Sequence, residues 1–348
     1  MSDLTGRERV LAVVRRSPVD RVPVGSMGFS EGVAREVRRL LGAPEDTDIN
    51  ALLGVDMRAV APAYTGPDFA FKPEHARRSF FASSHKSYAD GIVERPLRRA
   101  STTREVEAFP WPTADDYSFE EMAKRCAGGS DLALFGPGWT PTFSQLCELF
   151  GIETALINLI EKPGLIEAAI ERITDLICGL VRGMCRATGG QIPIFKTSDD
   201  VATQRGLMFS PTLWRRFFKP GLARQLEVAR GLGMLTMMHS CGDIGEILPE
   251  LVDLGLDILE PTQAHLPGLN PERLRREFGG RLTFFGAIST QTVLPCGTPR
   301  DVRREVQERL RTLGEGGGYI VSPDHQVLDD VPAENVIALY QAAGSLSG

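Results

Sequence analysis

The feature that most constrains this fold is a regular alternation of short apolar runs and amphipathic stretches through the second half of the chain. The apolar runs predict strands at residues 192–196, 234–238, 257–260, 282–286 and 319–322. The amphipathic stretches predict helices at residues 210–218, 222–231, 244–254, 271–278, 300–313 and 335–343. Strands that alternate with helices at this spacing are parallel and are joined by helical crossovers. The pattern therefore predicts an α/β protein.

The alternation favours a closed (β/α)8 TIM barrel over an open doubly wound sheet, because no glycine-rich dinucleotide-binding loop follows an early strand. No linker interrupts the pattern, so we predict one domain over residues 1–348, a length that α/β barrels reach as a single unit. The first half is less regular. There, residues 78–99 predict a β-hairpin excursion that turns at Asp90-Gly91. In such barrels the catalytic groups stand at the carboxyl ends of the strands.

Composition narrows the class of function. The 39 basic and 45 acidic residues give a formal net charge of -6, and without a basic stripe the chain is not expected to bind nucleic acid. No apolar run reaches the roughly 20 residues of a bilayer span, and residues 1–4 do not begin a signal peptide. We therefore expect a cytoplasmic enzyme that acts on a small molecule.

The six cysteines are too few for a disulfide scaffold. Four of them lie in apolar or helical surroundings typical of small buried thiols: Cys126, Cys147, Cys178 and Cys185. Cys296, between Pro295 and Gly297, is expected in a loop. The sixth, Cys241, lies beside a histidine at a predicted strand end.

His239 and Cys241 follow the strand at residues 234–238. Because they are two residues apart, both side chains can face the same side of the strand. One imidazole and one thiolate are half of a tetrahedral zinc site, although a histidine at a strand end can also simply bond a neighbouring carbonyl. His325, after the last strand, and Glu260, which ends another, are candidates to complete the site. Three protein ligands would leave a fourth position open for catalysis.

Asp199 and Asp200 follow the strand at residues 192–196. A carboxylate pair at a strand end suits substrate binding or acid–base chemistry, because two like charges raise the pKa of one member. The alternative is that they cap the following helix.

A series of motifs runs in order along nearly the whole chain. They are residues 7–11 (RERVL), 20–24 (DRVPV), 138–140 (GWT), 210–220, 239–243 (HSCGD), 248–259, 290–299, 316–319 and 332–337. Together they resemble the uroporphyrinogen decarboxylase superfamily, which includes the corrinoid-linked, zinc-dependent methyltransferases. This resemblance also implies a (β/α)8 barrel.

The resemblance to the methyltransferases implies a zinc ion that activates a thiol acceptor. Those enzymes bind it through H-x-C and a later cysteine in an S-P-x-C context. His239 and Cys241 match the first two ligands, and His325 stands where the third is expected. A corrinoid would have to be carried by a separate partner protein, because this chain has no Asp-x-His-x-x-Gly motif.

The resemblance to the decarboxylases implies a second hypothesis, loss of carbon dioxide from uroporphyrinogen or a smaller carboxylated substrate. Asp56 falls at their pyrrole-binding aspartate and His325 at a histidine of their closing motif. Their arginine-containing R-Q-A-G-R segment is residues 25–29 (GSMGF) here, so bidentate anchors for a polycarboxylate substrate are missing. A non-catalytic relative that binds a corrinoid or tetrapyrrole is the third hypothesis.

The predicted site residues fall into three groups. Those with a predicted catalytic role are Asp56, Glu260 and His325. Those predicted to bind substrate are Trp139, Asp199, Asp200 and Gln263. The predicted metal ligands are His239, Cys241 and His325, with Glu260 as a fourth ligand or close neighbour. A homodimer is one oligomeric state compatible with the chain.

Overall fold

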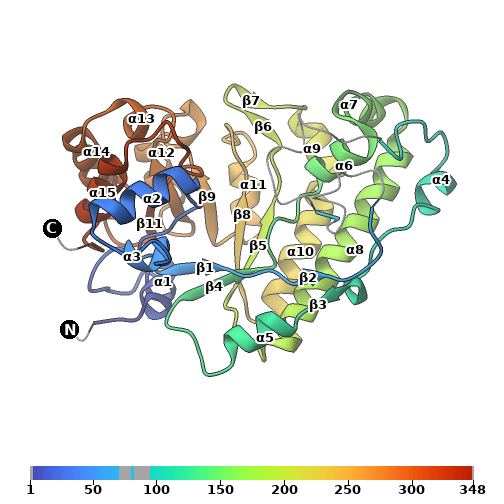
Figure 1. Cartoon of the computed structure of the whole chain (residues 1–348). Coiled ribbons are helices and arrows are strands. Elements are labelled where there is room, and N and C mark those ends of the chain that lie inside the picture. Colours follow the sequence, from blue (N-terminus) through green and yellow to red (C-terminus); the bar gives the residue numbers. More distant parts are fainter. Residues whose placement is uncertain (1–2, 70–79, 82–94, 347–348) are drawn as a thin grey trace. The chain divides into compact units, whose positions relative to one another are not determined.

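A computed structural model describes residues 3–69, 80–81 and 95–346 of the chain (Figure 1). Fifteen of the 22 residues of the hairpin predicted at residues 78–99, including its turn at Asp90-Gly91, lie outside the described residues. The chain divides into two compact units. Unit 1 comprises residues 1–58, 130–134 and 241–348, and unit 2 comprises residues 59–129 and 135–240.

Unit 2 contains the parallel pairing of the last two residues of β4 (Ala133–Gly136) with β5 (Ile194–Ser198), and of β5 with β8 (Leu235–His239). Nearly all of these strand residues are buried, as expected for parallel strands covered on both faces. In the register of β5 and β8, Ser198 pairs with His239. The two strands therefore end next to each other, and the residues that follow them emerge close together.

The helices of unit 2 cover these strands. Figure 1 shows the long α8 (Pro163–Ala187) beside α10 (Lys219–Gly231), against which it packs. The helix α9 (Pro211–Phe217) begins as predicted, because the Ser210 hydroxyl accepts a hydrogen bond from Leu213 N and Pro211 occupies the first turn. The remaining elements are β2 (Ala63–Tyr64), α4 (Thr103–Glu107), η3 (Ala114–Asp116), β3 (Tyr117–Ser118), α5 (Glu120–Cys126), α6 (Phe143–Phe150), α7 (Ile152–Glu161), β6 (Ala202–Thr203) and β7 (Gly206–Leu207).

Unit 1 contains a second parallel set, β9 (Ile258–Thr262), β10 (Thr283–Ile288) and β11 (Tyr319–Pro323). The helices α12 (Pro271–Phe278) and α14 (Pro299–Thr312) lie between consecutive strands in the sequence, and α14 packs on α15 (Ala333–Ala342). The α15 helix also packs on α2 (Glu31–Leu40). The remaining elements are α1 (Gly6–Val14), α3 (Ile49–Leu52), β1 (Met57–Ala59), which ends in unit 2, α11 (Leu248–Asp253), η4 (Pro267–Leu269) and α13 (Val293–Cys296).

The strands and helices predicted between residues 192 and 343 are all present, with ends displaced by at most four residues. Parallel strands joined by helical crossovers confirm the α/β class. The closed eight-stranded barrel and the single domain stay predictions. Most strands run further than their apolar runs, because burial continues through polar residues such as His239 and Thr262.

No single helix in the described part of the chain is both long and apolar enough to cross a bilayer. Only α6 and α7, taken as a pair that bends by 103°, match a span in length and composition.

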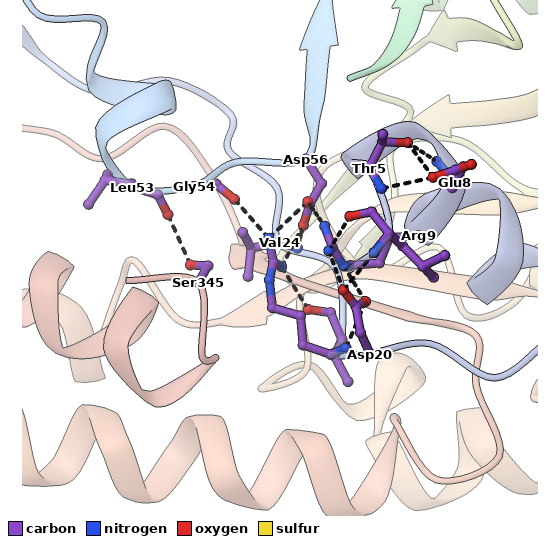
Figure 2. Close-up of polar contacts among 12 residues, drawn as sticks. Thr5, Glu8, Arg9, Asp20, Val24, Leu53, Gly54, Asp56 and Ser345 are labelled. Carbon is purple, nitrogen blue, oxygen red and sulfur yellow. Dashed lines mark hydrogen bonds and ion pairs between the residues drawn. The ribbon is translucent and has the colours of Figure 1, made fainter. Parts of the chain in front are cut away.

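A buried ion-pair network anchors the N-terminal segment of unit 1 (Figure 2). The carboxylate of Asp56 accepts hydrogen bonds from Arg9 Nη1 at 2.6 Å, from Arg21 Nη1 and Nη2 at 2.7 and 2.9 Å, and from Val24 N at 2.8 Å. Arg9 also binds Asp20 through Nε and Nη2 at 2.7 and 2.6 Å. A carboxylate can accept about four hydrogen bonds, so these contacts with the protein fill the acceptor positions of Asp56.

The Asp56→Asn substitution is expected to lower the free energy of unfolding by about 3–5 kcal/mol, because two guanidinium groups lose the buried charge that they share. Urea denaturation measures this. The control is Glu36→Gln, whose pair with Arg39 is 46% and 65% exposed and is expected to contribute nothing measurable. A loss for Asp56→Asn no larger than that of the control would contradict the anchoring role.

The same network predicts acid sensitivity. The hydrogen bonds from Arg9 hold the pKa of Asp20 well below its usual range. Such a group stabilises the fold above the unfolded pKa of about 3.9, and this stabilisation is lost as the pH falls toward the lowered folded value. Asp20→Asn should therefore lose less stability than the wild type between pH 5 and pH 3, as measured by urea denaturation at each pH. Parallel pH profiles for the two proteins would refute this.

Candidate functional site

His239 is the last residue of β8, and its side chain is buried. Asp199 and Trp139, which also belong to unit 2, contact it. The backbone N–H of Asp199 donates a hydrogen bond to His239 O at 2.8 Å. The indole of Trp139 lies edge-on to the imidazole, with 5.2 Å between ring centroids and 78° between ring planes. His239 therefore has a fixed backbone and an aromatic neighbour.

Asp200 supplies a carboxylate beside this histidine, with Oδ1 3.6 Å from His239 Nε2. One ligand atom each from Asp200, His239 and Cys241 lies within 4.8 Å of the other two. Cys241 follows His239 by two residues, so the local chain sets the separation of that pair. An imidazole nitrogen, a thiolate sulfur and a carboxylate oxygen are all zinc ligands, and three such donors are the number found in catalytic sites.

Asp199, the neighbour of Asp200, is directed elsewhere. Its carboxylate accepts hydrogen bonds from Phe143 N, at 2.8 and 2.9 Å to its two oxygens, and from Ser144 N at 3.2 Å. It thus caps α6, which lies earlier in the sequence, and not the helix that follows it. Burial raises the pKa of Asp199 to about 7, against the opposite effect of the backbone donors. Its predicted contact with substrate stays a prediction.

Gln263 supports the turn that follows Cys241. Its side-chain Oε1 accepts a hydrogen bond from Gly242 N at 2.8 Å. Gly242 has a φ of 91°, a conformation that residues other than glycine rarely adopt. The amide of Gln263 therefore helps to hold the chain just after the thiol. Its predicted role in substrate binding stays a prediction.

Unit 1 brings together a further cluster that the sequence prediction does not include. Buried Asp324 accepts hydrogen bonds from Thr290 N and Oγ1, both at 2.8 Å, and its Oδ2 lies 3.5 Å from His265 Nδ1. Asp324 follows β11, Thr290 follows β10 and His265 follows β9. A polar residue shortly after each strand is therefore the sequence pattern that could have predicted this cluster. His325 is half-buried next to Asp324, and Glu260 is buried within β9.

The other predicted site residues lie in two different places in the fold. Trp139, Asp199 and Asp200 gather around His239 in unit 2, whereas Asp56 is held by arginines in unit 1. The ligand roles of His239, Cys241 and His325, and the catalytic roles of Asp56, Glu260 and His325, stay predictions.

Comparison with known proteins agrees with the motifs. Residues 133–346, more than half of the chain, match the model of the uroporphyrinogen decarboxylase (URO-D) family. The chain belongs to this family. The predicted family is thereby confirmed.

Similar proteins in the family carry out two different reactions. The chain is 24% identical to the methylcobamide:CoM methyltransferase MtaA of Methanosarcina barkeri, over 98% of each chain. It is 20% identical to the uroporphyrinogen decarboxylase of Coxiella burnetii, over 74% of this chain and 70% of that one. A solved methyltransferase from Methanosarcina mazei matches 98% of this chain and 99% of its own at 20% identity, with a TM-score of 0.63, which shows a shared fold.

The cysteines divide by exposure, and this predicts their reactivity. Cys126, Cys147 and Cys178 are buried, and burial raises the pKa of the Cys147 and Cys178 thiols. Cys185 and Cys241 are half-buried. Cys296 is exposed, and it lies at the end of α13 rather than in the predicted loop. Because the thiolate is the reactive form and must be reached by the reagent, brief iodoacetamide treatment at neutral pH should modify Cys296 first, and Cys185 and Cys241 more slowly. Peptide mass spectrometry reads out each site, with a urea-unfolded sample as control. Modification of Cys147 as fast as Cys296 in the folded protein would contradict this order.

Proposed function

We propose that this protein is a zinc-dependent methyltransferase that moves a methyl group from a corrinoid, carried by a separate protein, or from another methyl donor, to a small acceptor. The observation that carries the proposal is the convergence of Asp200, His239 and Cys241 at the end of β8. It is supported by similarity along 98% of both chains to a protein whose name states methyl transfer between a methylcobamide and CoM.

The donor set fits zinc. His239 and Cys241 would hold the ion, with Asp200 or His325 as the third ligand and Glu260 as a further candidate. When bound, zinc lowers the pKa of a thiol, alcohol or water and so supplies a nucleophile at neutral pH.

The protein's own side chains would orient the reaction. The buried imidazole of His239 and the half-buried indole of Trp139 would form one side of the site. Beside such a surface, charged groups interact more strongly than in bulk water. The position of the Asp200 carboxylate would therefore affect how an acceptor binds there. A nucleophile held at a fixed position needs only a correctly oriented methyl donor for transfer, which is a large part of the rate advantage of such enzymes.

The geometry favours decarboxylation less. In the decarboxylase hypothesis Asp56 would bind the pyrrole N–H groups of the substrate. Here its carboxylate already accepts hydrogen bonds from Arg9, Arg21 and Val24. The guanidinium groups of these two arginines are already paired with Asp56. They therefore do not replace the arginine that would bind substrate carboxylates and is missing from residues 25–29.

Metal analysis tests the proposal. The purified protein should bind about one zinc per chain, and His239→Ala and Cys241→Ser should each weaken zinc binding by more than about 100-fold, since each removes a direct ligand. Cys296→Ser is the matched control. Comparing Asp200→Asn with His325→Ala identifies the third ligand. Added zinc should also protect Cys241, but not Cys296, from iodoacetamide.

The reaction is tested with methylcobalamin and coenzyme M, followed by the absorbance change on demethylation of the corrinoid. Zinc far below one per chain that does not change in His239→Ala would overturn the proposal. Carbon dioxide release from uroporphyrinogen would support decarboxylation instead, and corrinoid binding without turnover would support a binding protein.

A further inference from the structure

Trp139, which contacts the imidazole of His239, lies in the loop between β4 and α6. Two features hold this loop against the end of β5. Pro141 forms an isolated parallel bridge with Ser198. Two residues further, α6 begins at Phe143, and its N-terminus meets the side chain of Asp199. The position of the indole therefore depends on where α6 begins.

Asp199 is the cap of that helix. Thr142, at the N-cap position, makes no side-chain capping bond. Instead, the carboxylate of Asp199 accepts from the N–H groups of Phe143 and Ser144, donors that have no partner within the helix. The partial positive charge at a helix N-terminus adds to this attraction. Because Phe143 and Ser144 are buried, water could not readily replace the cap.

The same residue also holds the strand end. The backbone N–H of Asp199 donates to the carbonyl of His239 at 2.8 Å, continuing the pairing of β5 with β8. Asp199 is thus joined to His239 in two ways. Its main chain bonds the histidine backbone, and its side chain holds the helix whose preceding loop presents Trp139 to the imidazole.

We propose that Asp199 is a positioning residue for His239. It fixes both the backbone and the aromatic neighbour of this ligand, while the adjacent Asp200 faces the donor cluster. The inference rests on the proposed metal site. It gives the consecutive aspartates separate roles. It also accounts for a buried acid whose carboxylate, within the described part of the chain, accepts hydrogen bonds from backbone N–H groups.

The side chain also borders a small cavity of about 20 Å³, lined in part by Thr197, Ser198 and Gln225. A space of this size holds about one water molecule. Truncation to alanine would enlarge this cavity, and a larger cavity destabilises a fold by itself, so Asp199→Leu and Asp199→Asn are the better variants. Leucine fills the volume and removes the cap, whereas asparagine keeps one carbonyl oxygen that can accept from Phe143 N.

The test is a titration with Co²⁺ alone, read by visible absorption, including the thiolate-to-cobalt band, with thermal melting recorded on the same samples. The matched control is Asp175→Asn, an exposed acid of unit 2 that pairs with Arg224 on the helical surface. Asp199→Leu should weaken Co²⁺ binding by about 10–100-fold and shift the absorption bands. Asp199→Asn should lie between Asp199→Leu and the wild type, and Asp175→Asn should match the wild type.

Trp139→Leu keeps the test decisive if Asp199→Leu does not fold. This variant leaves the cap intact and should shift the same bands. Wild-type affinity and bands in a folded Asp199→Leu overturn the inference and leave the metal site standing. If Asp199→Leu does not fold, wild-type behaviour of both Asp199→Asn and Trp139→Leu overturns it. Failure of the wild type to bind Co²⁺ overturns both the proposed function and this inference.

Discussion

The candidate site depends on the register between β5 and β8. Ser198 pairs with His239, so the residue after one strand bonds the last residue of the other. Parallel strands end at the same edge of a sheet, and side chains emerging there from separate segments come together. A register shift of one residue would direct every side chain of the moved strand to the opposite face. His239 would then point away from Asp200. The tight backbone pairing is therefore what makes a donor cluster out of separate segments.

Buried carboxylates show how the protein handles charge in two ways. Asp56 is surrounded by the guanidinium groups of Arg9 and Arg21, which compensate its charge, and it secures the N-terminal segment. Asp199 has only backbone N–H donors in its described contacts, and burial raises its pKa to about 7. The first arrangement is a structural anchor with full ionic compensation. In the second arrangement, the poorly compensated carboxylate of Asp199 joins the N-terminus of α6 to the strand end that carries His239.

Local patterns in the sequence were enough to predict several features of the site. The H-x-C spacing predicts that both side chains face the same side, because residues two apart on a strand do so. The apolar run before it predicts the strand. The paired aspartates at the end of β5 were equally evident as polar residues at a strand end. What could not be foreseen is that they separate, with Asp199 capping a helix that begins 56 residues earlier and Asp200 facing His239. Neither contact leaves a local trace in the sequence.

The sequence by itself determined the α/β class, the order of strands and helices in its second half, and the family, because periodicity and motifs depend on residues near one another in the chain. Only the tertiary structure decided the partners of each functional side chain. Asp56 is predicted to be a catalytic residue, yet its carboxylate accepts hydrogen bonds from two arginines that come from separate places in the sequence. Gln263 likewise bonds the turn after Cys241. The physical reason is that hydrogen bonds and ion pairs depend on distance in space, which strand register and helix packing set only once the chain has folded.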